Sequence, residues 1–320
     1  MWYRRISHLV NLARERRHRD DAGAPKVPFR LEMETLRQLD RLQIVGHRSL
    51  RGDRIGVRQS NRGKPSVEFR EHRMYVPGDD IRFLDWRASA RHEQIFIRQG
   101  EMPKDVIVYL LVDCSASMYW GNHPKRELQL ALAASLGYIA LNNGDRLYLS
   151  PYSDRRNVEF GPASGKGYIS NFIRHLSLLR YGGQSDLETA VRALAKRVSR
   201  GGILFILSDL LEKGDLSTVL SAVPVPKWRV NVFHMLHPAE IEPEIRGTFE
   251  LEDSENGRRV NYDLTNEAIR RYKERLETWQ DQLERTAIEH HASYTVLNTD
   301  WSLSKEVLPY LRKRQILERL

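Results

Sequence analysis

The sequence predicts an α/β protein, with a mostly parallel sheet flanked by helices and a smaller N-terminal β-rich module. From Val106 onward, short apolar runs alternate with amphipathic segments, as in proteins whose strands and helices follow each other along the chain. The run from Val106 to Val112 is apolar at every position, which is typical of a central parallel strand. Between Gly46 and Gln99 this alternation is absent, and glycine and arginine are frequent among short β-prone pieces.

Two segments are expected before the α/β domain. Residues 1–44 are predicted to be a basic N-terminal helical segment and linker, and residues 45–104 the β-rich module. Within the first segment, residues 1–20 have the pattern of a basic helix, and the glycine and prolines of residues 20–28 indicate a linker. Residues 31–43 are expected to form a short amphipathic helix.

Residues 105–300 are predicted to form the α/β domain, and residues 301–320 a C-terminal helix. Asn256-Gly257 favours a type I′ hairpin turn within residues 249–262, and Thr265 is expected to cap a long helix. The expected strands are 106–113, 146–152, 157–160, 203–208, 229–236 and 294–297, and the expected helices are 127–142, 168–179, 186–199, 265–289 and 304–316.

The composition is that of a soluble globular protein, because 29% of the 320 residues are charged and 41% are apolar. No stretch approaches the roughly 20 apolar residues of a membrane span, and the basic N-terminus lacks the apolar core of a signal peptide. The single cysteine, Cys114, excludes an internal disulfide and suits a reducing compartment. We therefore expect a cytoplasmic protein without a transmembrane segment.

The positive charge is concentrated in the first third of the chain. Residues 1–105 contain 23 Lys and Arg against 15 Asp and Glu, whereas the remainder contains 28 against 27. A basic region of this kind is typical of proteins with an acidic partner, which can be nucleic acid, anionic lipid or an acidic protein face. The alternative is that the arginines pair with nearby carboxylates, which we favour between Arg70 and Arg91 and leave open between Arg4 and Arg19.

A polar cluster follows the run that ends at Val112. Asp113, Ser115 and Ser117 place one carboxylate and two hydroxyls close together. Ligands of open α/β sheets bind outside the carboxyl ends of the strands, and hard oxygen donors suit Mg²⁺ or Mn²⁺. These residues are therefore candidates for a metal site, and the alternative is that they cap the following helix. Cys114 is expected to be a small buried side chain.

Two further segments are expected at the same sheet edge. The apolar run 202–208 ends at Asp209, and a glycine turn precedes Ser185 and Asp186. Together the three segments resemble the metal-ion-dependent adhesion site of von Willebrand factor A domains, which have a Rossmann-type fold. That family usually has Thr where this chain has Ser185, and Asp186 is the competing ligand in this loop. The resemblance implies a divalent cation, Mg²⁺, Mn²⁺ or Ca²⁺, held by Asp113, Ser115, Ser117, Ser185 and Asp209.

A second resemblance rests on a long motif within residues 46–98. It consists of Gly46-His47-Arg48-Ser49, Val67-Glu68-Phe69-Arg70, Pro77-Gly78-Asp79-Asp80, Asp85-Trp86 and Ser89-Ala90-Arg91. This block is similar to bacterial proteins of the domain of unknown function 58 family, over about residues 40–240. The resemblance implies a von Willebrand A-like domain directly after the block. It also implies a partnership with MoxR-type AAA+ ATPases, beside which such proteins are typically encoded. Many members carry membrane helices ahead of the block, and we expect none here.

Three classes of function are compatible with the sequence. We favour a non-enzymatic, metal-dependent protein-interaction module that acts with a MoxR-type ATPase in chaperone-like complex assembly. The first alternative is a metal-dependent phosphoester hydrolase, although the sequence shows no nucleophile and base in a recognisable pattern. The second is nucleic-acid binding through the basic N-terminal region, although no zinc-finger or RNP pattern occurs. No Gly-x-x-x-x-Gly-Lys-Ser/Thr loop is present, so we expect neither ATPase activity nor another enzymatic activity.

Overall fold

The computed structural model describes residues 31–45, 68–75, 84, 86–92, 94–101, 106–119, 125–197, 201–211, 214–223, 228–244, 246–252 and 259–320. The chain divides into two compact units, one of residues 53–105 and one of the remaining residues. The predicted basic helix, the linker and the Pro77–Asp80 turn lie outside the described residues.

The large unit is built on a sheet of mixed direction in which parallel pairs predominate. Its strand order is β11-β8-β7-β4-β5-β6, and only the pair of β5 and β6 is antiparallel. The predicted mostly parallel sheet is therefore confirmed. The strands are β4 (Ile107–Asp113), β5 (Arg146–Tyr152), β6 (Phe160–Ser164), β7 (Ile203–Ser208), β8 (Arg229–Leu236) and β11 (Ser293–Asn298).

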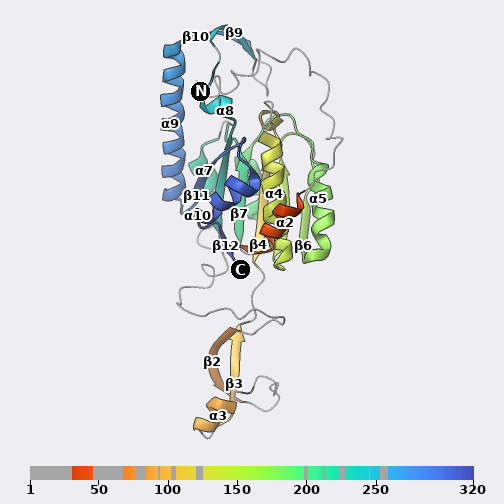
Figure 1. Ribbon diagram of the computed structural model, residues 1–320. Coiled ribbons are helices and arrows are strands. Elements are labelled where there is room, and N and C mark those ends of the chain that lie inside the picture. Colours follow the sequence, from red (N-terminus) through yellow and green to blue (C-terminus); the bar gives the residue numbers. More distant parts are fainter. Residues whose placement is uncertain are drawn as a thin grey trace. The chain divides into compact units, whose positions relative to one another are not determined.

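Strand β4 lies inside the sheet, between β5 and β7, and all of its residues are buried. Its side chains alternate between two hydrophobic cores. Val108 and Leu110 face a core with α2, α4, α5 and α10, while Tyr109 and Leu111 face a core with α6, α7 and α9. Helices thus cover both faces of the sheet (Figure 1). Burial on both faces explains why this run is apolar at every position.

The helices predicted within the described residues of the large unit are present with shifted ends, and two short helices, Leu216–Ser221 and Pro238–Ile241, were not predicted. Thr265 caps α9 as expected, because its hydroxyl oxygen accepts a hydrogen bond of 3.2 Å from the Ala268 N–H. The helices are α2 (Met33–Leu39), α4 (Lys125–Asn142), α5 (Ile169–Ser177), α6 (Leu187–Arg197), α7 (Leu216–Ser221), α8 (Pro238–Ile241), α9 (Asn266–Glu289) and α10 (Leu308–Lys313). Among the described residues, no helix has both the length and the apolar content that crossing a bilayer requires.

The edge strand predicted at residues 157–160 is in fact β6, which begins at Phe160. Asn157 lies outside this strand and binds the backbone of Arg180. Its side chain donates to the Arg180 carbonyl at 2.8 Å and accepts from the Arg180 N–H at 2.9 Å. The predicted hairpin is confirmed as β9 (Gly247–Glu252) paired antiparallel with β10 (Arg259–Leu264). Its Asn256-Gly257 turn lies outside the described residues.

Two short strands, one near each end of the described part of the large unit, pair with each other, which the sequence did not predict. Strand β1 (Leu42–Ile44) pairs antiparallel with β12 (Leu317–Arg319). The helix expected over 31–43 is therefore shorter, since α2 ends at Leu39 and the residues after it turn into β1. The helix expected over 304–316 begins instead as a π-helical turn, Leu303–Val307, continues as α10 and stops before β12.

The small unit contains an antiparallel pair, β2 (Glu68–Met74) and β3 (Phe96–Glu101), with a register shift between Phe69 and Glu71. A short helix, α3 (Trp86–His92), lies between them in the chain. These described elements fall within the segment predicted to be β-rich.

Candidate metal centre

The parallel strands bring two predicted residues to one edge of the sheet. Asp113 is the last residue of β4, and Asp209 follows the last residue of β7. The two strands are parallel neighbours, so their carboxyl ends meet. Both carboxylates are buried, with exposed fractions of 0% for Asp113 and 1% for Asp209. Buried carboxylates require donors or cations to compensate the water that they lose.

Asp113 is held by uncharged donors. Its Oδ1 accepts from the Ser115 N–H at 2.9 Å, and its Oδ2 accepts from the Ser208 hydroxyl at 2.7 Å. Burial and the nearby negative charge of Asp209 raise the pKa of Asp113 to about 6, although these hydrogen bonds lower it. The uncharged donors around Asp113 therefore compensate its negative charge only in part.

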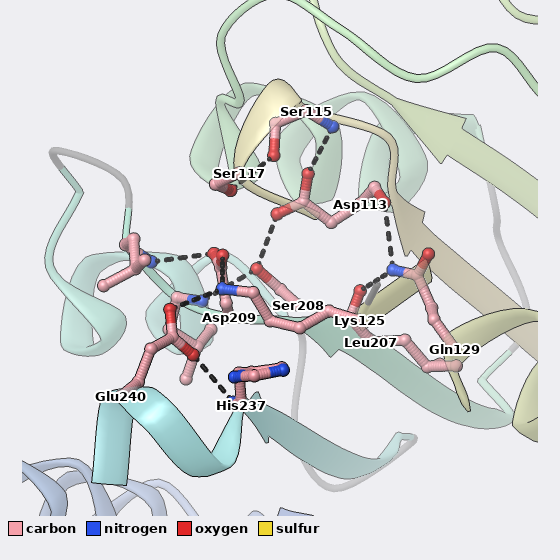
Figure 2. A network of polar contacts seen from close by, with 12 residues as sticks. Asp113, Ser115, Ser117, Lys125, Gln129, Leu207, Ser208, Asp209, His237 and Glu240 are labelled. Carbon is pink, nitrogen blue, oxygen red and sulfur yellow. Dashed lines mark hydrogen bonds and ion pairs between the residues drawn. The ribbon is translucent and has the colours of Figure 1, made fainter. Parts of the chain in front are cut away.

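Two buried serines follow Asp113 in the turn after β4. The hydroxyls of Ser115 and Ser117 lie 3.0 Å apart and are buried. The Ser117 side chain is among the groups that lower the pKa of the Asp209 carboxyl. Figure 2 shows the two carboxylates and the two hydroxyls gathered at the end of the strands. We call Asp113, Ser115, Ser117 and Asp209 the edge cluster.

Ser185 lies in a neighbouring loop that is bonded to the first one through the backbone. The Gly182 N–H donates to the Cys114 carbonyl at 2.8 Å, and the Ala116 N–H donates to the Gly183 carbonyl at 3.0 Å. Gly183 has a φ of 75°, and a Cβ at this position would overlap the Asp154 carboxylate. The lack of a side chain at Gly183 therefore leaves room for Asp154, and the two backbone bonds bring this loop beside the one that follows β4.

Asp186, the competing ligand of that loop, has a different role. Its Oδ1 accepts from the Thr189 N–H at 2.9 Å and its Oδ2 accepts from the Thr189 hydroxyl at 2.8 Å. The first of these bonds satisfies a free N–H in the first turn of α6, as a helix N-cap does. This geometry argues against Asp186 as a ligand and leaves Ser185 as the candidate of this loop.

The turn after β7 has a strained backbone. Leu210 has a φ of 55°, which is uncommon for a residue with a branched side chain. Side chains of the preceding residues hold this turn, since the Leu210 N–H donates to the Ser208 hydroxyl and the Leu211 N–H donates to Asp209 Oδ1. The strain is thus located at the residue that follows a candidate ligand.

Two charged residues of the site were missed in the sequence. The Lys125 ammonium, from the first turn of α4, lies 2.6 Å from Asp209 Oδ2 and 2.9 Å from Glu240 Oε1. Glu240 belongs to α8, directly after β8, and its Oε2 accepts from the His237 N–H at 2.7 Å. All three charged side chains are almost completely buried (Figure 2). A glutamate just beyond the carboxyl end of a third parallel strand is the signal by which sequence reasoning could have found Glu240.

The ion pairs change the pKa values of these groups in opposite directions. Burial lowers the pKa of Lys125, but the two carboxylates outweigh it and raise that pKa above its usual value. Burial raises the pKa of Asp209, but Lys125 outweighs it and holds that pKa below its usual range. Burial raises the pKa of Glu240, and Lys125 offsets only part of this increase. Lys125 is therefore charged at neutral pH.

A glutamine connects the two strands beneath the site. Gln129 Nε2 donates to the carbonyls of Asp113 and Leu207, each at 2.9 Å, and its Oε1 accepts from the Tyr181 hydroxyl at 2.7 Å. Gln129 is fully buried on α4, one turn after Lys125. It fixes the ends of β4 and β7 relative to each other.

The donor set fits a hard divalent cation. Oxygens of two carboxylates and two hydroxyls lie at the ends of two adjacent strands (Figure 2), and such ligands suit Mg²⁺, Mn²⁺ or Ca²⁺. With Asp113, Asp209 and Glu240 ionised and Lys125 protonated, the formal charge is minus two, which one divalent cation neutralises. In the described part of the chain, no three His, Cys, Asp or Glu side chains are grouped as metal ligands. A site here would therefore depend on the serine hydroxyls.

These observations define an α/β protein whose parallel strands end in a buried polar cluster. A model of the family described as "Protein of unknown function DUF58" matches residues 71–282. The match covers about two thirds of the 320 residues, so the chain belongs to the DUF58 family.

Two relatives illustrate the range of similarity. The uncharacterized protein Rv1480 of Mycobacterium tuberculosis is 28% identical over 244 residues, which cover 75% of this chain and 74% of that protein. The uncharacterized protein YeaD of Bacillus subtilis is 28% identical over 106 residues, which cover 33% of this chain and 25% of that protein.

Two solved structures are similar at low sequence identity. One is the conserved hypothetical protein BatB from Bacteroides thetaiotaomicron, with a TM-score of 0.40 and 13% identity, covering 65% of this chain and 98% of that one. The other is an aerotolerance-related membrane protein from Bacteroides fragilis, with a TM-score of 0.38 and 16% identity, covering 66% and 98%.

Proposed function

We propose that the chain is a non-enzymatic, metal-dependent protein-interaction module with a von Willebrand A-like domain at residues 105–300. A divalent cation at the edge cluster would receive an acidic side chain from a partner protein. The observation that carries the proposal is the hydrogen-bonded group of Asp113, Ser115 and Ser117 at the end of β4, beside the buried Asp209 carboxylate at the end of β7. It joins the ends of two neighbouring parallel strands, where open α/β sheets bind their ligands.

The residues have distinct roles in this proposal. The hydroxyls of Ser115 and Ser117 would ligate the cation directly, with Ser185 from the neighbouring loop. Asp113 and Asp209 would act through waters. When bound, the cation supplies a positive charge that uncharged hydroxyls and waters leave largely uncompensated, so a carboxylate is attracted to its remaining position.

The surroundings support an acidic partner. The Arg126 guanidinium, from the first turn of α4, lies 4.7 Å from the ring centre of Tyr119 and 5.8 Å from that of Tyr181. Tyr119 is 46% exposed, so this arginine and tyrosine lie at the surface beside the edge cluster. The family resemblance suggests a MoxR-type AAA+ ATPase as the partner and chaperone-like complex assembly as the process.

The side chains near the cluster do not favour nucleophilic catalysis. Cys114 is fully buried, and burial and the Asp113 charge raise the pKa of its thiol well above the usual value. A protonated, inaccessible thiol is a poor nucleophile. His234 is also fully buried, and burial lowers its pKa to about 3. We therefore propose a binding function rather than hydrolysis, and a cytoplasmic location in which the free thiol of Cys114 persists.

The test has two parts on the full chain. Calorimetry with Mg²⁺ and Mn²⁺ is expected to show one site in the wild type that is lost in Asp113→Ala and weakened at least tenfold in Ser115→Ala. Ser164→Ala is the matched control, because that hydroxyl is exposed and donates to the Gly144 carbonyl away from the cluster. Measurable binding of equal affinity in the wild type and Asp113→Ala would refute the metal site.

The second part is a pull-down with the candidate MoxR-type ATPase, with and without EDTA. Binding should require the metal and should be lost in Ser115→Ala and Asp209→Ala. Binding that ignores both chelation and these substitutions would place the interaction elsewhere. Metal-dependent phosphatase turnover that Asp113→Ala abolishes would instead establish the hydrolase alternative.

A further inference from the structure

The metal-binding proposal gives the buried ammonium of Lys125 no role of its own. It bridges Asp209 Oδ2 at 2.6 Å and Glu240 Oε1 at 2.9 Å, and its side chain is 1% exposed. A lysine is seldom buried to this extent unless it is paired, and here both partners are also buried carboxylates. Its position therefore results from specific contacts rather than from loose packing of a surface side chain.

Lys125 already occupies one oxygen of a candidate metal-site residue. The Asp209 oxygen closer to it is bound by a unit positive charge. The other oxygen, Oδ1, accepts from the Leu211 N–H at 3.3 Å. A divalent cation near Asp209 would share this carboxylate with the ammonium and would be repelled by it. Such repulsion is strong where water is excluded.

Glu240 is the second acceptor of the Lys125 ammonium. Its second oxygen is fixed by the His237 N–H at 2.7 Å, and the Tyr272 hydroxyl donates to its main-chain carbonyl. Glu240 is therefore a rigid acceptor on α8, away from the serines of the edge cluster. It also adds the negative charge that brings the formal charge of the buried group to minus two.

We propose that Lys125 is an internal cation that competes with the divalent ion for Asp209, and that Glu240 limits this competition by holding the ammonium. The inference rests on the proposed metal site and specifies what sets its affinity. When the divalent ion binds, Lys125 remains on Glu240 alone. Consequently, the chain by itself binds the ion weakly, and the site gains affinity if Lys125 loses its charge.

The experiment compares three proteins: the wild type, Glu240→Gln, and the double variant Lys125→Met with Glu240→Gln. Glu240→Gln removes a negative charge and leaves the ammonium on Asp209, so the affinity for Mg²⁺ and Mn²⁺ should fall at least tenfold. The double variant removes the charges of both Lys125 and Glu240. Asp113 and Asp209 then restore the formal charge of minus two. Its affinity should be at least tenfold higher than that of Glu240→Gln, and equal to or above that of the wild type.

The double variant is chosen because Lys125→Met alone leaves two buried carboxylates unpaired and endangers folding. Circular dichroism and thermal unfolding verify that each protein is folded. The matched control is Lys273→Met with Glu242→Gln, which removes an exposed ion pair close to Glu240 in the sequence. This control should bind both metals as the wild type does.

The outcomes separate this inference from the proposed function. If the wild type binds metal through Asp113 but Glu240→Gln and the double variant bind within twofold of it, the competition is refuted and the metal site stands. If the wild type binds no metal and the double variant does, Lys125 is the cause and the inference is supported. If none of the proteins binds metal, both the metal site and the competition are wrong.

Discussion

Asp113 and Asp209 are the same residue type, equally buried and located at the ends of adjacent strands, yet their environments act in opposite directions. Asp113 is compensated only by a backbone N–H and a hydroxyl, and its pKa is raised to about 6. Asp209 is compensated by the Lys125 ammonium, and its pKa is lowered. The half of the site around Asp209 therefore contains its own cation, Lys125, whereas the half around Asp113 lacks one. The comparison teaches that burial alone does not decide the state of a carboxylate, because the charge of its nearest partner does.

The largest expected effect comes from removing the cation of the Asp209 half. Lys125→Met leaves Asp209 and Glu240 buried without their partner, so the free energy of unfolding should fall by about 3–5 kcal/mol. Urea denaturation of the full chain measures it. The control Lys273→Met affects an exposed ion pair with Glu242 and should leave the unfolding free energy unchanged within error. An equally small effect for Lys125 would show that its ion pairs add nothing to stability.

The second prediction concerns the half that lacks a cation. In EDTA, the wild type should lose about 2 kcal/mol of stability relative to Asp113→Asn as the pH rises from 4 to 7. Because the pKa of Asp113 is raised from 3.8 to about 6 in the folded chain, the folded state binds more protons than the unfolded state over this interval. Loss of these protons as the pH rises therefore favours unfolding.

Denaturation at each pH, with Asp263→Asn as the control for an exposed aspartate, provides the measurement. A wild type and Asp113→Asn whose stabilities change in parallel with pH would show that Asp113 is not destabilised by its charge. Adding Mg²⁺ at pH 7 should restore the wild type more than Asp113→Asn, since the cation supplies the missing positive charge.

The difference between the two halves also shows what the sequence can reveal. Asp113 and Asp209 were predictable because each follows a run of apolar residues, and such runs mark buried parallel strands whose ends meet. The central sheet and its flanking helices followed from the same pattern. Whether the predicted ligands bind a metal remains a prediction.

Lys125 was not predictable in this way. A lysine in the first turn of a helix has the pattern of a solvent-exposed residue, and its partners lie 84 and 115 residues further along the chain. The pairing of β1 with β12 was missed for the same reason, because Gln43 and Glu318 are 275 residues apart. Local periodicity contains no information about contacts of this separation, which arise only when the sheet is assembled.

The third prediction tests the loop that lies beside Asp113. Gly183→Ala should lower the unfolding free energy by about 1–2 kcal/mol, because the residue has a positive φ that disfavours a Cβ. The Asp154 side chain can move away from the new methyl group, so the backbone dominates the cost. Gly167→Ala is the control, since no atom lies within 4 Å of its Cβ position and no positive φ is recorded for it. An unchanged stability in Gly183→Ala would show that this loop adapts freely.

The smallest expected effect distinguishes Ser185 from Asp186. Asp186→Ala removes a helix cap and should lower the unfolding free energy by about 1 kcal/mol. It should leave the affinity for Mg²⁺ unchanged, because both of its oxygens are engaged by Thr189. Ser185→Ala should instead lower the affinity for Mg²⁺ several-fold. Calorimetry and urea denaturation on both variants give the four values.

If Asp186→Ala lowers the metal affinity and Ser185→Ala does not, the aspartate is the ligand of this loop. The cap on α6 would then have to open when the metal binds, and the metal would gain a charged ligand in place of a hydroxyl.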